Sequence, residues 1–323
     1  MIERMNTPRW LLFHLHHQIP GNMAIVLIAG GSGLIGMRLS ELLTEQGHEV
    51  RHFSRSSGGR SPYATFQWDV AGGSYDAAAF QGVTHVIHLA GAGVADARWT
   101  DRRKQLIIES RTESTRLLKK GIAAHGSTVK AYLAGSAIGF YGNSGEQLVT
   151  EDTPAGNGFL SESVSIWEDA IQEIPQELNL PTLVVRTGIV LSPQGGALQK
   201  MLLPLHLFVS SYFGSGQQWY SWIHIDDICR IFVKGVDDDQ FRGLFNGVAP
   251  NPVRNKTLAQ ALITASQKFA FLLPAPAFIL RLVLGEMSHT ILDSCQVSAE
   301  KLKDSGFTFE HPTIVPALED LLQ

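Results

Sequence analysis

Residues 29–43 read AGGSGLIGMRLSELL, and this stretch decides the fold because its glycines separate a β-rich run from a helical one. Gly30 permits a tight turn, Gly33 lets the backbone approach a pyrophosphate, and Gly36 lets the helix lie close to the sheet. A glycine-rich turn without a ligand is the simpler interpretation, but the strand before and the helix after favour dinucleotide binding. The predicted contacts are Gly30, Ser32, Gly33, Leu34, Ile35 and Gly36.

Outward from this motif, short β-rich runs alternate with longer helical segments. The expected strands are 24–29, 49–53, 64–68, 85–90, 130–135 and 182–191, and the expected helices lie near 34–47, 101–125 and 163–178. This alternation predicts an α/β fold with a doubly wound parallel (Rossmann) sheet. After residue 191 the alternation stops. We therefore expect a nucleotide-binding domain of residues 23–191 and about 217–250, and a smaller C-terminal substrate lobe of about 192–216 and 251–323.

The end of the second strand, RHFSRS (51–56), bears on which dinucleotide is bound. A carboxylate there would bind the ribose hydroxyls of NAD and repel the additional phosphate of NADP. Ser54 stands in that place instead, and Arg55 follows it with a planar cation suited to a 2′-phosphate. The alternative is a solvent-exposed arginine on a loop. The pattern favours NADP.

The composition excludes several classes of partner. Of 323 residues, 44% are apolar and 17% are charged, and the 26 basic and 30 acidic residues give a net charge of -4 without long runs of one sign. We therefore expect a small-molecule substrate, with no nucleic acid and no membrane as partner. Cys229 and Cys295 lack metal-ligand spacing and indicate a reducing compartment, the cytoplasm. Nothing in the composition specifies an oligomeric state.

Two apolar segments raise the question of a membrane. Residues 1–22 hold a short apolar run that histidines interrupt, so we interpret them as a tail or a start placed too early rather than a secretion signal. Residues 269–285 are strongly apolar, but Pro274, Pro276 and Arg281 leave less than the roughly 20 residues that a spanning helix needs. We expect a buried helix there.

Ten motifs, the glycine-rich turn among them, lie in order along residues 23–323 and resemble the extended short-chain dehydrogenase/reductases, specifically their atypical epimerase-like family with a C-terminal domain of unknown function. They are GGSGLIG (30–36), QWD (67–69), HLAG (88–91), RWT (98–100), ESRTEST (109–115), GSAIGFYG (135–142), RTGIVL (186–191), GSGQQWYSWIHIDD (214–227), PNPVRN (250–255) and KLKDSGFTFEHPT (301–313). The resemblance implies that Asp69 contacts the adenine and that Leu89, Ala90 and Gly91 pass beside the cofactor.

The resemblance also implies a serine, tyrosine and lysine that act together on a hydroxyl proton, because a phenol needs a neighbouring cation to react at neutral pH. Ser136 matches the serine. The tyrosine position falls at Phe159 and the lysine position at Ser163, within NGFLSESVSIWEDA (157–170), and Glu162 occupies the one place where a substitute lysine would stand. The serine remains, whereas the acid–base pair is missing.

Other residues could take over the missing chemistry. Tyr141 lies five residues after Ser136 and is either a proton donor or a structural tyrosine. His224 precedes Asp226 and Asp227, and we expect an aspartate to cap a helix there rather than to join His224 in a metal site. We predict no metal. Four further residues either bind an anionic substrate or form salt bridges: Arg98, Ser110, Arg111 and Arg186.

Two functions are consistent with these observations. The first is an NADP(H)-dependent epimerase or oxidoreductase acting on a small hydroxyl or carbonyl compound, possibly a nucleotide sugar, with Ser136 and Tyr141 as the catalytic candidates. The second is a catalytically degenerate NADP(H)-binding sensor. The motifs of the second lobe favour the enzyme, and the missing tyrosine and lysine favour the sensor.

Overall fold

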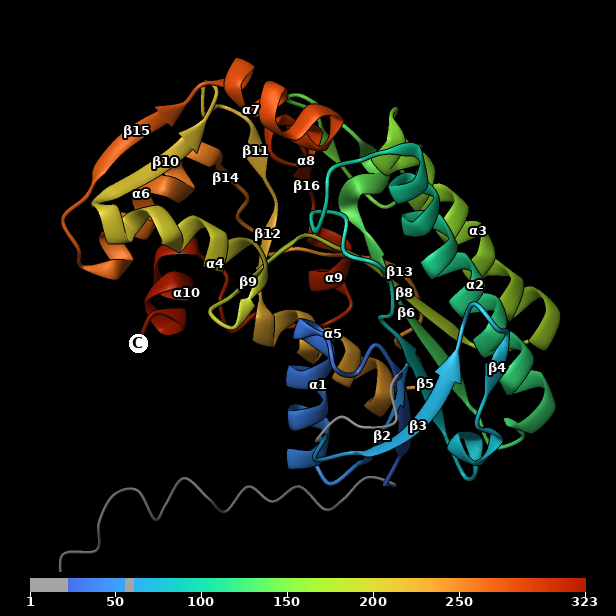
Figure 1. Ribbon diagram of the computed structural model, residues 1–323. Coiled ribbons are helices and arrows are strands. Elements are labelled where there is room, and N and C mark those ends of the chain that lie inside the picture. Colours follow the sequence, from blue (N-terminus) through green and yellow to red (C-terminus); the bar gives the residue numbers. More distant parts are fainter. Residues whose placement is uncertain (1–22, 56–60) are drawn as a thin grey trace, which may run out of the picture.

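An eight-stranded sheet, in the order β13-β8-β6-β5-β1-β2-β3-β4, forms the centre of the computed structural model, which describes residues 23–55 and 61–323 (Figure 1). All pairs in this sheet are parallel except β3–β4. The doubly wound α/β prediction is confirmed. Its strands are β1 (Ile25–Ala29), β2 (Glu49–Ser54), β3 (Ala64–Asp69), β4 (Ser74–Tyr75), β5 (His85–His88), β6 (Ala131–Ala137), β8 (Thr182–Thr187) and β13 (Gly243–Gly247).

Helices cover both faces of the sheet. Helix α1 (Leu34–Glu45) packs beside α5 (Ile225–Asp237), and α2 (Asp101–His125) packs beside α3 (Phe159–Leu178) on the other face (Figure 1). The hydroxyl of Thr100 accepts the amide of Arg103 and so caps α2. Helix α3 begins four residues before the expected start, because Gly158, with φ of 93°, turns the chain into it.

The stretch 182–191 is two strands rather than the single strand expected. Gly188 lies between β8 and β9 (Ile189–Ser192), and a Cβ atom there would lie 2.6 Å from the carbonyl oxygen of Ser221. β9 leaves the central sheet and pairs with β12 (Trp222–His224). The break sends the chain out of the Rossmann sheet and into a group of short elements, which we call the second lobe.

The second lobe consists of short elements around small two-stranded sheets, with β10 beside β15 and β11 beside β14. Its bounds are α4 (Gly196–Leu202), η4 (Leu203–Leu207), β10 (Val209–Phe213), β11 (Trp219–Tyr220), β14 (Val253–Arg254), α6 (Asn255–Ser266), β15 (Phe271–Ala275), α7 (Ala277–Leu284), η5 (Gly285–Ser288), α8 (His289–Leu292), β16 (Gln296–Val297), α9 (Glu300–Asp304) and α10 (Ile314–Leu321). β16 pairs with β7 (Leu148–Val149), and the short helices η2 (Ala77–Phe80) and η3 (Ile138–Tyr141) belong to the first part of the chain.

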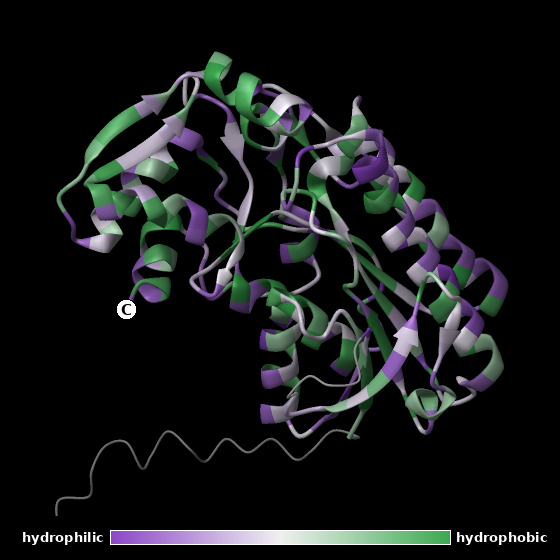
Figure 2. Ribbon diagram, in the orientation of Figure 1, coloured by the Kyte–Doolittle hydropathy of each residue, from purple (hydrophilic) through white to green (hydrophobic). Residues whose placement is uncertain are grey.

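The expectation of a buried helix at 269–285 is wrong. Pro274 and Pro276 restrict the segment to the strand β15 followed by the eight-residue helix α7, which begins after Pro276. Its large side chains face outward, as the 71% and 76% exposure of Phe278 and Leu282 shows. Figure 2 shows β15 and α7 as mostly hydrophobic segments at the outer edge of the lobe. None of the helices in 23–55 and 61–323 has the length and apolar content to cross a bilayer.

The largest apolar cluster runs through both parts of the molecule. It includes Val26 of β1, Phe232 of α5, Leu258 of α6 and Leu318 of α10, and all four are buried. The expected division between nucleotide-binding domain and substrate lobe therefore stays a prediction. The expectation for residues 1–22 lies outside the described residues.

Candidate active site

The glycine-rich turn brings the ends of β1 and β5 into contact. Gly30 has φ of 90°, which favours glycine, and a Cβ atom there would lie 2.7 Å from the amide nitrogen of Ala90. Leu89 is equally close to that position, through its carbonyl carbon. The loop 89–91 that the sequence assigns to the cofactor therefore lies directly against the glycine-rich turn.

The first turn of α1 has its amides free for an anion. Gly33 is the N-cap residue, and within the described ranges no side chain caps this helix end and no acidic residue lies in its first turn. A Cβ atom on Gly36 would overlap the carbonyl oxygen of Gly30, so the helix can lie this close only with glycine there. Ser32 is exposed beside the turn, and Leu34 and Ile35 are half-buried in the first helical turn. The arrangement suits a diphosphate at the helix N-terminus.

The residues for the adenosine end of a dinucleotide follow the next two strands of the sheet. Ser54 ends β2, and Arg55 follows it, exposed and without an ion pair to another described residue. Asp69 ends β3 and lies against Gly72, where a Cβ atom would overlap its carboxylate. A guanidinium that forms no ion pair with a described residue, after a strand β2 that ends in a serine, fits a 2′-phosphate.

Ser136, at the end of β6, belongs to a buried charged group that the sequence did not reveal. Its hydroxyl donates to Oε1 of Glu168 on α3 over 2.6 Å. Arg186, near the end of β8, donates from Nε and from a terminal nitrogen to the two oxygens of the same carboxylate, over 2.8 and 2.7 Å. Ser136 is only 4% exposed and Arg186 3%. We call these three residues the Ser-Glu-Arg group.

Tyr141 lies at the far side of this group. Its hydroxyl donates to Asn246 over 2.7 Å and accepts from Arg186 over 3.0 Å. Burial raises the pKa of the Tyr141 phenol, and the hydrogen bond from Arg186 partly offsets this rise. The Tyr141 phenol is buried and already donates its proton to the amide oxygen of Asn246, as a tyrosine with a structural role does. A catalytic role for Tyr141 stays a prediction.

The two residues at the positions of the missing tyrosine and lysine, Phe159 and Ser163, make packing and helix contacts. Phe159, the first residue of α3, packs edge-to-face against Trp99, with ring centroids 4.8 Å apart. The ammonium nitrogen of Lys104 lies 5.3 Å from the Phe159 ring. Ser163 is buried and donates to the carbonyl of Leu160 within the helix. Phe159 has no proton to supply, and the buried Ser163 hydroxyl donates its proton to the helix backbone.

Glu168 is the residue that sequence reasoning missed, although a signal was present. It follows Trp167 on α3, whose buried residues recur at helical spacing, so a carboxylate beside that face needs a partner. The partners Ser136 and Arg186 lie on two neighbouring strands, and only the fold brings them together.

Of the four residues left open as anion ligands, the structure pairs two within the protein. Arg186 binds Glu168, and the hydroxyl of Ser110 accepts the amide of Ala92 and so holds the loop after β5. Arg98 lies against Gly285, where a Cβ atom would be 3.1 Å from its Nε. Arg111 lies against Gly91 in the predicted cofactor loop.

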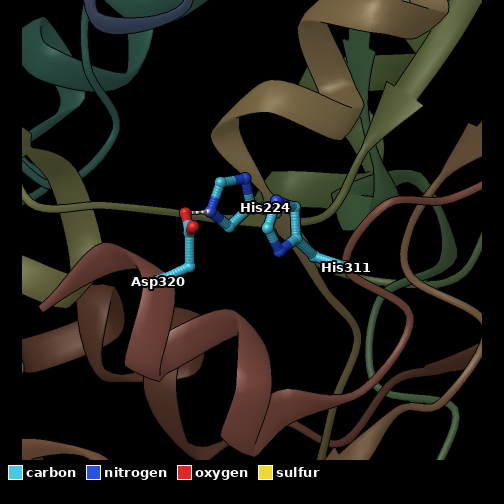
Figure 3. Close-up of side chains that lie close together, drawn as sticks. All are labelled: His224, His311 and Asp320. Atoms are coloured by element: carbon cyan, nitrogen blue, oxygen red, sulfur yellow. Dashed lines mark ion pairs between the residues drawn. The ribbon is translucent and has the colours of Figure 1, made fainter. Parts of the chain in front are cut away.

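His224 forms a cluster with His311 and Asp320 instead of the aspartates that follow it (Figure 3). Its Nδ1 accepts the amide of Asp226, so His224 caps α5 itself and the expectation of an aspartate cap is wrong. Its ring stacks on His311 with centroids 3.7 Å apart, and its Nε2 lies 3.3 Å from Asp320.

This cluster does not suit a metal in its present hydrogen bonding. Burial, and then the neighbouring His311, lower the pKa of His224, so the ring is neutral near pH 7. Because Nδ1 accepts a hydrogen bond, Nε2 of the neutral ring carries the proton and has no lone pair for an ion. A metal-binding histidine has the opposite arrangement, with its second nitrogen donating.

Two family models match this chain. The model of the NAD-dependent epimerase/dehydratase family matches residues 26–243, which include the glycine-rich turn and the Ser-Glu-Arg group, and a domain of unknown function, DUF1731, matches residues 275–321. The chain belongs to the NAD-dependent epimerase/dehydratase family. The resemblance inferred from the motifs is confirmed.

Relatives within the epimerase/dehydratase family extend over nearly the whole chain. An epimerase family protein of Staphylococcus aureus (strain NCTC 8325 / PS 47) is 35% identical over 306 residues, which are 92% of this chain and 98% of that protein. The crystal structure of human epimerase family protein SDR39U1 (isoform 2) with NADPH has a TM-score of 0.83 and 31% identity, covering 92% of this chain and 99% of that one. The nucleoside-diphosphate sugar epimerase of Corynebacterium glutamicum has a TM-score of 0.74 and 30% identity, covering 93% and 58%. The NADP prediction agrees with the cofactor of the human protein.

Proposed function

We propose that this epimerase-family protein binds NADP(H) and transfers hydride to or from a hydroxyl or carbonyl carbon of a small molecule, as an oxidoreductase or an epimerase. The Ser-Glu-Arg group carries this proposal. It lies at the carboxyl ends of β6 and β8, beside the β5 loop that meets the glycine-rich turn, and ligands of open α/β sheets bind at this edge. The group also contains a carboxylate, Glu168, which can accept a proton in a site that lacks the expected tyrosine and lysine.

The proton can move between the substrate and Glu168 through Ser136. A substrate hydroxyl donates to the Ser136 oxygen, whose own hydrogen already points to Oε1 of Glu168 over 2.6 Å. As the substrate oxygen becomes a carbonyl, its proton passes to Ser136 and the Ser136 proton passes to Glu168. Arg186 holds the carboxylate in place through two hydrogen bonds, and burial of the group strengthens these charge interactions. The reverse sequence delivers a proton to a carbonyl oxygen.

The cofactor, when bound, supplies the other half of the reaction by accepting or giving the hydride at its nicotinamide. Support for NADP(H) comes from the N-terminus of α1, which no described side chain caps, and from the close backbone contacts at Gly30 and Gly36. The exposed guanidinium of Arg55, which pairs with no described carboxylate, supports it as well. The NADPH of the human relative supports the same choice.

We infer a substrate site between the carboxyl edge of the sheet and the second lobe, which would be the smaller substrate lobe expected from the sequence. The relative from Corynebacterium glutamicum, a nucleoside-diphosphate sugar epimerase, supports a nucleotide sugar as one substrate class to test. A panel of sugars, aldehydes and ketones extends the test to simpler carbonyl compounds.

The test measures oxidation of NADPH against this panel for the wild type, Ser136→Ala and the control Ser165→Ala. Ser165 is also a serine that donates within α3, but it lies outside the Ser-Glu-Arg group. We expect turnover by the wild type and by Ser165→Ala, and a roughly 10²–10⁴-fold lower rate for Ser136→Ala. Equal rates for the two variants would contradict the proton path, and loss of activity in Tyr141→Phe alone would move the proton donor to Tyr141.

A second candidate function, an NADP(H) sensor without turnover, is supported by Phe159 and Ser163. If the wild type binds NADPH but is inactive with every compound, Phe159→Tyr combined with Ser163→Lys decides between the two functions. Activity gained only by this variant would support the sensor, since it would show that the cofactor and substrate sites are intact and that the proton chemistry is missing.

A further inference from the structure

Arg111 is the partly buried cation of helix α2 that lacks a carboxylate partner among the described residues, whereas Arg102 and Lys120, which also lack one, are exposed. Arg103, Lys104, Arg116 and Lys119 each form an ion pair with a carboxylate. Arg111 forms no ion pair with any residue in 23–55 or 61–323, although it lies in the middle of the helix on the side that faces the protein. Its guanidinium donates a hydrogen bond to the carbonyl of Ile107, over 2.9 Å.

The surroundings of Arg111 make the missing counter-charge costly. Its guanidinium carbon lies 5.1 Å from the ring of Trp167, and a Cβ atom on Gly91 would lie 3.0 Å from it. Burial, and then the nearby cation Arg103, lower the pKa of Arg111 to about 10, with Asp96 acting in the opposite direction. A cation held out of water without an anion is destabilising, and a bound anion would remove that cost.

The position of Arg111 identifies where this anion would lie. Gly91 follows Ala90, whose amide lies against Gly30 of the glycine-rich turn. Trp167 is the neighbour of Glu168 in the chain, and its ring reaches to 4.0 Å from the position of a Cβ atom on Gly135, the residue before Ser136. Arg111 therefore lies between the predicted cofactor loop and the Ser-Glu-Arg group.

We propose that Arg111 binds an anionic group, a phosphoryl or carboxylate oxygen pair, of the molecule that occupies this edge of the sheet. A planar guanidinium can donate two parallel hydrogen bonds to either group. The inference rests on the NADP(H) site proposed above, and the anion belongs either to the cofactor or to the substrate. If it belongs to the substrate, the substrate carries its negative charge close to the reacting carbon.

The experiment compares the full chain with Arg111→Met, which removes the charge and keeps an unbranched apolar side chain. The control is Arg116→Met, which removes an exposed cation from the same helix. Two quantities are measured for each protein: the Kd of NADPH by fluorescence, and the shift of Tm caused by inorganic phosphate with and without saturating NADPH. Arg111→Lys shows whether charge alone is sufficient.

Two results support the inference and separate the two sources. If the cofactor supplies the anion, Arg111→Met weakens NADPH binding by about tenfold or more and phosphate has no effect once NADPH is bound. If the substrate supplies it, NADPH binding is unchanged, and phosphate raises the Tm of the NADPH-saturated wild type but not of Arg111→Met. In both cases Arg116→Met behaves as the wild type does.

The inference is overturned if Arg111→Met and the wild type respond alike to both NADPH and phosphate, whether or not the variant is less stable. This outcome is distinct from failure of the proposed function. A protein that turns over no carbonyl compound but shows either supporting result retains the anion site. A protein that turns over substrate, and whose Arg111→Met variant responds to NADPH and phosphate as the wild type does, lacks the site.

Discussion

The two ends of the candidate active site are held together differently, one by backbone contacts and the other by side-chain interactions. At the cofactor end, Gly30 and Gly36 allow backbone to touch backbone, and only glycine meets that requirement. At the proton-transfer end, Ser136, Glu168 and Arg186 are joined by side-chain charges and hydrogen bonds. Side-chain chemistry can be replaced by other side chains, whereas a close backbone contact cannot. The close backbone contacts of the glycine-rich turn are therefore present here, while Phe159 and Ser163 stand at the positions expected for a tyrosine and a lysine.

The largest effect is expected from breaking the charged end. Glu168→Gln leaves the buried guanidinium of Arg186 without its counter-charge, which should lower the free energy of unfolding by about 3–5 kcal/mol. Urea unfolding measures this loss. The control is Glu173→Gln on the same helix, whose partner Lys119 and whose own side chain are partly exposed, and which should cost less than about 1 kcal/mol. Similar losses in both variants would show that the Ser-Glu-Arg group is no more important to stability than a surface pair.

A somewhat smaller effect should appear at the adenosine end. Arg55→Ala removes the guanidinium that we assign to the 2′-phosphate, at a cost of about 1.5–3 kcal/mol in NADPH binding. This corresponds to a roughly 10- to 150-fold weaker Kd, with little change for NADH. Fluorescence titration with both cofactors measures it, and Arg281→Ala, which removes an exposed arginine of α7, is the control. Equal affinity of the wild type for NADPH and NADH would refute the assignment.

The backbone contact itself can be disturbed by one methyl group. In Gly36→Ala the new Cβ would overlap the carbonyl oxygen of Gly30, and displacement of α1 should cost about 1–3 kcal/mol, shared between stability and NADPH binding. Gly195→Ala is the matched control, because its Cβ would be 3.6 Å from the nearest atom, on Leu34. Tm and NADPH affinity are measured for both variants. A Gly36→Ala protein with unchanged affinity and Tm would show that the contact tolerates a side chain.

The last expected effect is absent at neutral pH and develops only on acidification, as a pH dependence at the cofactor end. His52 is buried against Gly31 and its Nε2 forms a 2.8 Å hydrogen bond with Ser40; burial lowers its pKa from 6.5 to about 4. Because the unfolded chain binds this proton more readily, the contribution of His52 to stability is present above pH 6.5 and is lost as pH falls toward 4. Within that window the loss is about 1.4 kcal/mol per pH unit.

His52→Phe should lose this part of the pH dependence in urea unfolding between pH 7 and pH 5, whereas His125→Phe, at an exposed position on α2, should retain it. Burial lowers the pKa of His85 to about 4 and that of His88 to about 3. Both histidines are present in the wild type and in the two variants, so all three proteins keep this additional loss of stability in acid. Identical slopes for the wild type and His52→Phe would contradict the assignment to His52.

Local sequence patterns were sufficient for most of the Rossmann sheet. Alternating β-rich and helical runs placed β1, β2, β3, β5 and β6, because a local run of β-forming residues marks each of these strands. The break at Gly188 was not predictable, since its cause is the carbonyl of Ser221, which is distant in sequence. The Ser-Glu-Arg group was not predictable for the same reason: Ser136 stood in a motif, but its hydrogen bond to Glu168 joins residues 32 apart in the sequence. The exposure of α7 was not predictable either, because it depends on which surfaces of the second lobe other elements cover.

The position of β13 affects how the chain folds during synthesis. β8 ends at residue 187, and the strand that covers its open edge, β13, ends at residue 247, after the chain has passed through β9–β12 and α5. At ordinary translation rates this interval lasts roughly 3–12 s. Over that time β8 can already pair with β6, but its other edge has no partner strand. Such an unpaired edge is a template for association with other chains. The late return of the chain to the central sheet thus leaves the edge of β8 open to other chains until β13 docks.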